Sequence, residues 1–207
     1  WQQGKTDTGN QLGWMMMGKR AFRVEEFREA IGDLKAAQWR VFTDNFLPIV
    51  LSAAQSAAGL NWFDDERWRI ITQNFAVVAQ IAASGGLKGL ILDPEHYNYY
   101  LFRYADQRQQ VDRPFADYVG VVRQRGREVM TAIAAHLPKA VLLSLYAYTL
   151  PLSERERGKR LEDTGYGLLP AFYDGLLEAM PSGAFLVDGY ESAYAFKERR
   201  HFLEGYR

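Results

Sequence analysis

The sequence predicts an α/β fold, specifically a (β/α)8 TIM-type barrel that forms one partial domain over residues 1–207. Helical patterns alternate with short apolar runs, which is the order of βαβ units. These runs are mostly continuous, as in parallel strands covered on both faces. Acidic or aromatic residues follow each run, where barrel enzymes build their sites. Eight units at this spacing need roughly 350 residues, so we expect further strands outside this chain.

The elements follow one another in four helix–strand units. In the first, apolar residues at helical spacing predict a helix over 24–34, and a strand follows at 39–42. The other three units pair helices 66–83, 115–136 and 167–180 with strands 87–92, 140–145 and 184–187. An open doubly wound sheet has the same order of elements. We favour the barrel because no glycine-rich phosphate loop follows any strand.

Composition excludes several classes of protein. The 25 Lys and Arg balance 25 Asp and Glu, so there is no basic excess for binding nucleic acid. No cysteine is present, which excludes disulfides and thiolate metal sites. No apolar run approaches the ~18 residues of a membrane span. We expect no membrane association and no cofactor; a bacterial secreted, a periplasmic and a cytoplasmic location all fit.

The strongest candidate site is the end of the predicted strand 87–92. Asp93 and Glu95 follow it two residues apart, so on an extended chain they share one face. In such a pair one carboxylate stays ionised and raises the pKa of the other, which then serves as a general acid. Glycoside hydrolysis needs two carboxyl groups in these roles. The alternative is that Asp93 caps the next helix and Glu95 is solvated.

This segment resembles the acidic strand of glycoside hydrolase family 18, whose pattern is Asp-Gly-x-Asp-x-Asp-x-Glu. Gly89, Asp93 and Glu95 match its glycine, last aspartate and acid glutamate, whereas Lys88 and Ile91 replace its first two aspartates. Pro94 stands where tryptophan is common. The resemblance covers about ten residues and extends to the wider superfamily of barrel glycoside hydrolases. It implies a barrel glycosidase with Glu95 as the proton donor.

Other polar and aromatic residues also follow predicted strands. Asp188 and Glu191 are candidates for the opposing carboxylate, or they begin the last helix. Asp44 and Asn45 could bind sugar hydroxyls, or they serve as turn residues. Rings at these strand ends offer platforms for sugars. The candidates for this role are Tyr97, Tyr146, Tyr148 and Tyr190.

Three functions are compatible with these residues. The first is a carbohydrate-active hydrolase that cleaves a glycosidic bond of an oligosaccharide or polysaccharide, with Glu95 as acid and Asp93 tuning it. The second is a metal-dependent barrel lyase, isomerase or hydrolase that uses Asp93, Glu95 and His96. The third is a non-catalytic carbohydrate-binding barrel. We expect Asp44, Asp93, Tyr146 and Asp188 to lie on one rim of the sheet, because each follows the C-terminal end of its predicted strand.

Overall fold

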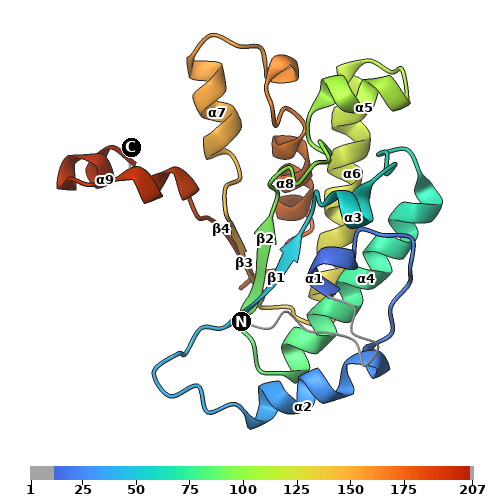
Figure 1. Ribbon diagram of the computed structural model, residues 1–207, viewed down its shortest axis with the longest axis vertical. Helices are drawn as coiled ribbons and strands as arrows, with labels where there is room; N and C mark the ends of the chain where they lie inside the picture. The colour runs from blue at the N-terminus through green and yellow to red at the C-terminus, as the bar shows by residue number, and fades with distance from the viewer. Residues whose placement is uncertain (1–11, 206–207) are drawn as a thin grey trace.

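The computed structural model describes residues 12–205 and contains one parallel sheet with helices around it (Figure 1). The strands are β1 (Phe46–Val50), β2 (Gly89–Asp93), β3 (Val141–Ser144) and β4 (Phe185–Asp188). The α-helices are α1 (Leu12–Met15), α2 (Arg28–Ala36), α3 (Ala54–Ala57), α4 (Asp65–Ser84), α5 (Tyr104–Gln110), α6 (Phe115–Ala134), α7 (Thr149–Glu156), α8 (Leu169–Glu178) and α9 (Arg199–Gly205). Three 3-10 helices are η1 (Val24–Phe27), η2 (Leu161–Asp163) and η3 (Glu191–Ala195).

The strands pair in sequential order, β1-β2-β3-β4, and every pairing is parallel. Sequential parallel order is what the repeated helix–strand units predict. The prediction of a (β/α)8 barrel, however, is wrong. Within residues 12–205 the sheet has four strands, and β1 and β4 are its two open edges rather than paired neighbours. The alternation of helices and strands determines parallel pairing, but closure depends on strand number and stagger, which that alternation does not encode.

The last three strands and the three long helices lie within a few residues of their predicted positions. The first strand does not. Residues 39–42 form a turn in which Arg40 has a φ of 50° and Val41 is 84% exposed, and the strand begins only at Phe46. Pro48 interrupts the apolar run and hides it from a pattern search. The sheet tolerates this proline because β1 is an edge strand.

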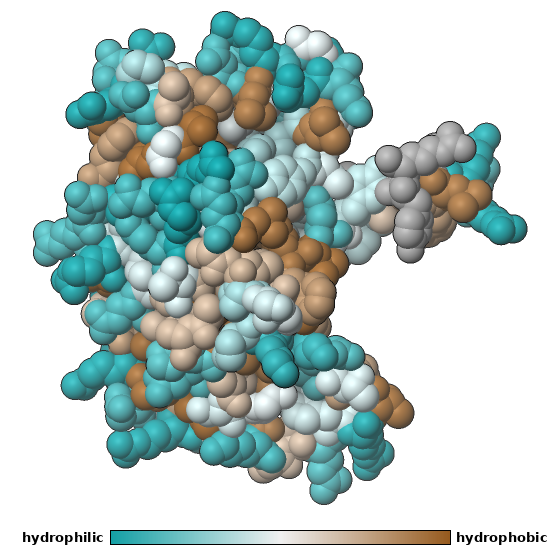
Figure 2. Space-filling view, turned by 180° about the vertical axis from the view of Figure 1, so that it is seen from behind, coloured by the Kyte–Doolittle hydropathy of each residue, from teal (hydrophilic) through white to brown (hydrophobic). Residues whose placement is uncertain are grey.

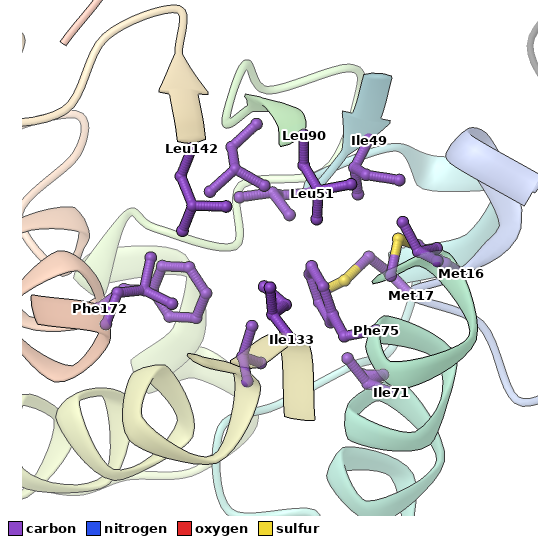
Figure 3. Close-up of a cluster of buried hydrophobic side chains, with 14 of the residues drawn as sticks. Met16, Met17, Ile49, Leu51, Ile71, Phe75, Leu90, Ile133, Leu142 and Phe172 are labelled. Atoms are coloured by element: carbon purple, nitrogen blue, oxygen red, sulfur yellow. The ribbon is translucent and has the colours of Figure 1, made fainter. Parts of the chain in front are cut away.

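The core lies between the sheet and the three helices α4, α6 and α8, which stand together on one side of it (Figure 1). Side chains of three neighbouring strands point toward aromatic and aliphatic side chains of these helices (Figure 3). The residues that meet in this way are Ile49, Leu90 and Leu142 from the sheet, and Phe75, Ile133 and Phe172 from the helices. This layer buries enough apolar surface to hold the strand ends in fixed positions.

Helices α6 and α8 approach each other closely at two glycines. A Cβ atom on Gly126 would lie 2.2 Å from the carbonyl oxygen of Phe172. A Cβ atom on Gly175 would lie 2.0 Å from the carbonyl oxygen of Arg123. The backbones therefore touch where no side chain fits, which fixes the position of α8 and of the loop that precedes it.

Within the described residues, the helices cover only one face of the sheet fully. Burial alternates along β3, where Leu142 and Ser144 are buried and their neighbours are half-exposed. Along β4, Phe185 and Val187 are 61% and 42% exposed. Hydrophobic residues also gather at the base of the arm that η3 and α9 form (Figure 2). Continuous apolar strands predict cover on both faces, and the described residues provide it on one. Among the helices described, none is long and apolar enough to cross a membrane.

Candidate active site

The end of β2 is built by Asp93 and the proline that follows it. Pro94 has no backbone N–H and cannot continue the ladder, so the strand ends at Asp93. The Asp93 Oδ1 atom accepts the backbone N–H of Glu95 at 3.0 Å, which forms a tight turn. The predicted pair is therefore held together by the local sequence, with the Glu95 carboxyl turned back over the strand end.

The hydroxyl of Tyr97 joins the two carboxyl groups. It lies 3.0 Å from Oδ2 of Asp93 and also contacts Oε2 of Glu95. The Tyr97 ring packs against Trp14 of α1, with 5.2 Å between ring centroids. Its backbone is held as well, because the amide of Ala54 donates to the Tyr97 carbonyl at 2.9 Å. Tyr97 is thus fixed with its hydroxyl committed to the carboxyl pair.

A third carboxyl group reaches this cluster from β4. Glu191 begins η3, and its backbone N–H donates to the carbonyl of Leu145 at 3.0 Å, which holds the segment beside the end of β3. Burial raises the pKa of Glu191, and so do the charge of Glu95 and a hydrogen bond with it. A neighbouring negative charge disfavours ionisation, so this position favours the protonated form of Glu191.

Asp93 is a partly buried member of the cluster. Burial raises its pKa from 3.8 to about 6, and the charges of Glu95 and Glu191 act in the same direction. The hydrogen bonds from Tyr97 and from the Glu95 amide oppose this shift because they favour the ionised form. The sequence predicts Glu95 as the carboxyl with the raised pKa; the structure raises the pKa of Asp93 and Glu191.

Two tyrosines stand beside the carboxyl groups, and a histidine stacks on one of them. The Tyr146 hydroxyl donates to the Tyr166 hydroxyl at 2.7 Å, and the two rings meet edge to face. The His96 ring stacks on Tyr166 with 4.0 Å between centroids. Burial raises the pKa of Tyr146 and of Tyr166, and the charges of Asp93 and Glu95 contribute to both shifts. These hydroxyls therefore lie close enough to the cluster to sense its charge.

Asp188 lies at the end of β4 but faces away from Asp93. In the sheet register Asp188 aligns with Ser144, and Ser144 aligns with Leu92, so these side chains share the helix-covered face. Asp93 is one residue further along and points to the opposite face. The Asp188 carboxylate accepts three hydrogen bonds, from the amide and hydroxyl of Thr149 and the amide of Tyr190. Its contacts are those of a structural residue that joins β4 to the start of α7.

The predicted aromatic platforms separate into two groups. Tyr97 and Tyr146 lie at the carboxyl cluster, although the Tyr97 ring is covered by Trp14. The Tyr148 hydroxyl donates to Asp174 of α8 at 2.6 Å. Tyr190 packs against Phe196, in the segment that leads to α9. The structure places Tyr148 and Tyr190 in contacts that do not involve the carboxyl groups.

Asp44 and Asn45 lie at the N-terminal ends of the strands, whereas the carboxyl cluster lies at their C-terminal ends. They precede β1 rather than follow a strand, because the strand predicted at 39–42 is a turn. Asp44 pairs with Lys88 at 3.4 Å, just before β2 begins. The length of β2, five residues, separates the N-terminal ends of the strands from Asp93 by about 15 Å. The prediction that Asp44 shares a rim with Asp93, Tyr146 and Asp188 is therefore wrong.

A metal centre at Asp93, Glu95 and His96 finds no support in the geometry. Among the described residues, no group of three or more His, Cys, Asp or Glu side chains is arranged to hold a metal ion. The His96 ring lies flat against Tyr166 rather than beside the two carboxyl groups. Burial lowers the pKa of His96 to about 4, so it is neutral near pH 7.

Sequence reasoning missed Tyr166 and Trp14 as members of the site. Tyr166 belongs to no strand end; it lies between Gly165 and Gly167 in the loop before α8, and α8 positions it. The glycines on either side of Tyr166 are the local signal that could have marked it, because they are typical of a turn. Trp14 precedes three methionines and carries no signal for a site.

No family model matches this chain, and it has no significant similarity to any curated protein or solved structure.

Proposed function

We propose that this protein hydrolyses glycosidic bonds, with Glu95 and Glu191 as the working carboxyl pair and Glu95 as the proton donor. One observation carries the proposal: carboxyl groups that follow β2 and β4 come together at one place, where Glu191 lies close enough for the charge of Glu95 to raise its pKa. Glycosidases need two carboxyl groups beside the scissile bond, one protonated and one ionised. Proximity of the two groups favours this state because double ionisation is disfavoured.

The roles follow from proton balance. The Glu95 O–H bond breaks as its proton passes to the leaving-group oxygen, and the bond between that oxygen and the sugar carbon breaks with it. The Glu191 carboxylate then attacks the sugar carbon, or removes a proton from the water that does so. The carboxyl groups of retaining enzymes lie ~5 Å apart and those of inverting enzymes ~6.5–9.5 Å apart. Because the charge of Glu95 acts on Glu191 at short range, we assign Glu191 as nucleophile, with retention of configuration.

Asp93 and the tyrosines support this pair. Asp93 accepts the backbone N–H of Glu95 and so holds the turn that carries the Glu95 carboxyl group. Tyr146 and Tyr166 supply ring edges and hydroxyls beside the carboxyl groups, which suits a ligand with both apolar faces and hydroxyl groups. A sugar has this chemistry, and an apolar ligand would leave the hydroxyls unpaired.

The experiment compares Glu95→Gln, Glu191→Gln and the wild-type protein on a panel of natural oligosaccharides and of aryl glycosides with activated leaving groups. Glu95→Gln should lower kcat by ~10²–10⁴-fold on natural substrates and much less on activated ones, whose leaving groups need no proton. Glu191→Gln should lower kcat on both classes, because the attacking group is lost. Glu156→Gln, an exposed carboxyl on α7, is the matched control and should retain wild-type turnover.

Full turnover by Glu95→Gln on a natural substrate would overturn the proposal. Equal loss on natural and activated substrates would show that Glu95 is not the proton donor. Binding of sugars by the wild-type protein without hydrolysis of any substrate would instead identify a carbohydrate-binding protein. The anomer released first, followed by proton NMR, tests retention independently of the mutants.

A further inference from the structure

The Tyr97 hydroxyl contacts two carboxyl groups but has a single proton. Its oxygen lies 3.0 Å from Oδ2 of Asp93 and also contacts Oε2 of Glu95. A phenol donates one hydrogen bond, so it satisfies only one of these two contacts as donor. The other contact is favourable only when the carboxyl group carries a proton and donates it to the phenol oxygen. Because the Tyr97 oxygen contacts Oδ2 of Asp93 and Oε2 of Glu95, one of these two carboxyl groups must carry a proton.

We infer that Tyr97 is a positioning residue through which Asp93 and Glu95 share one proton. The Tyr97 hydroxyl donates to one carboxyl group and accepts from the other, and the two arrangements interconvert when both protons move. The sharing itself depends only on the contacts of these three side chains. Its use in catalysis rests on the proposed function.

The groups around Asp93 favour retention of this proton. Those that face it come from the turn after β2, the segment after β3, the loop before α8 and η3. They are Glu95, Tyr97, Tyr146, Tyr166 and Glu191. Every member of this set is either neutral or negative near neutral pH, so the set opposes a second negative charge in the unit.

Tyr97 cannot easily leave this bridge. Its ring packs against Trp14, its carbonyl accepts the amide of Ala54, and its own amide donates to the Glu95 carbonyl at 3.2 Å. The residue is held on both the backbone and the ring, so the hydroxyl is presented at a fixed point. This arrangement also removes Tyr97 from the sugar-binding role that its position after a strand predicts.

The shared proton gives Glu95 a way to reach its acid form when the proton rests on Asp93. The Tyr97 O–H bond breaks and its proton binds Glu95, while the Asp93 O–H bond breaks and that proton restores the Tyr97 hydroxyl. Glu95 then gives the proton to the leaving group, which leaves both carboxyl groups ionised until a proton from solvent reloads the unit. The number of protons is conserved in each step.

The test is a carbon-13 NMR titration of the Asp and Glu carboxyl carbons in the labelled protein. In Tyr97→Phe the titration midpoint of Asp93 should rise by about one pH unit, because the hydrogen bond that favours its ionised form is lost. In Glu95→Gln it should fall by about one unit, because the neighbouring charge is lost. Tyr148→Phe, which removes a hydroxyl bonded to Asp174, should leave the midpoint unchanged.

An Asp93 midpoint that is the same in Tyr97→Phe as in the wild-type protein would overturn the inference, and Glu95→Gln would then report only a charge effect. Failure of Glu95→Gln to lower the midpoint would also overturn it. These readouts need no substrate, so they separate the inference from the proposed function. If the protein hydrolyses glycosides, the alkaline limb of kcat in Tyr97→Phe should move to higher pH with the Asp93 midpoint, whereas a merely structural loss would lower kcat at every pH.

Discussion

The Tyr146 hydroxyl donates a hydrogen bond to the Tyr166 hydroxyl at 2.7 Å, and the same Tyr166 oxygen accepts the backbone N–H of His96 at 3.3 Å. Both contacts use the lone pairs of Tyr166, so its own proton remains to be donated. Since this proton lies beside the carboxyl cluster, it is available to a hydroxyl or ring oxygen of a bound sugar.

Tyr166→Phe should therefore weaken the binding of a sugar ligand. Loss of one neutral hydrogen bond corresponds to about 0.5–1.5 kcal/mol, or roughly a three- to tenfold rise in Kd by calorimetry. Tyr148→Phe is the control, because its hydroxyl binds Asp174 away from the cluster. Equal Kd values for Tyr166→Phe and the wild-type protein would show that this hydroxyl does not contact the ligand.

Replacement of Asp188 should destabilise the fold rather than act on chemistry. Asp188→Ala removes an acceptor of three hydrogen bonds, two of them from Thr149 at the start of α7. We expect the free energy of unfolding in urea to fall by about 2–3 kcal/mol. Thr149→Val, which removes one of these bonds, should cost about 1 kcal/mol. A folded Asp188→Ala protein of wild-type stability, with a large loss of kcat, would place Asp188 in the active site instead.

Two glycines of α6 should respond in opposite ways to the same substitution. Gly126→Ala places a Cβ atom 2.2 Å from the Phe172 carbonyl oxygen, so α6 and α8 must separate. We expect a loss of about 2–3 kcal/mol in the free energy of unfolding. Gly120→Ala meets no atom within 4 Å and should stabilise the helix by about 0.5–1 kcal/mol. Urea unfolding of both variants tests whether α6 and α8 are in backbone contact.

The raised pKa of Asp93 makes stability depend on pH. Its folded pKa of about 6 exceeds the ordinary value of 3.8, so the folded protein binds this proton more tightly. The stabilisation is complete below pH 4 and is lost as the pH rises through 6. The shift corresponds to at most about 3 kcal/mol, and partial exposure of Asp93 reduces this to about 1–2 kcal/mol.

Asp93→Asn removes this titration. Between pH 4 and pH 7 the wild-type protein should lose about 1–2 kcal/mol of unfolding free energy relative to Asp93→Asn, as measured in urea. Glu156→Gln, with its exposed carboxyl on α7, should follow the wild-type curve. A constant difference between the wild-type protein and Asp93→Asn across this range would show that Asp93 titrates normally in the folded protein.

Much of the fold could be predicted because it depends on local patterns. The three long helices and the strands β2, β3 and β4 are marked by periodicity and by glycine or proline at their ends. The sequence predicts the first strand at 39–42 instead of at β1 because Pro48 lies within β1, and only the edge position of β1 in the sheet makes that proline acceptable. The prediction for Asp44 is wrong as a direct consequence, because Asp44 precedes β1 rather than following a strand.

As with the fold, only the part of the candidate site that depends on local sequence could be predicted. The Asp93–Glu95 turn follows from local sequence, since Pro94 ends the strand and the Asp93 side chain accepts the amide two residues on. Which other residues join this turn depends on tertiary packing. The sheet register places Asp188 on the face opposite to that of Asp93. The segment after β4 places Glu191 near Glu95. The position of α8 delivers Tyr166 to the cluster. A turn is determined by residues that are neighbours in the chain. The contacts of Glu191 and Tyr166 depend instead on packing between elements that are far apart in the chain, which no local pattern encodes.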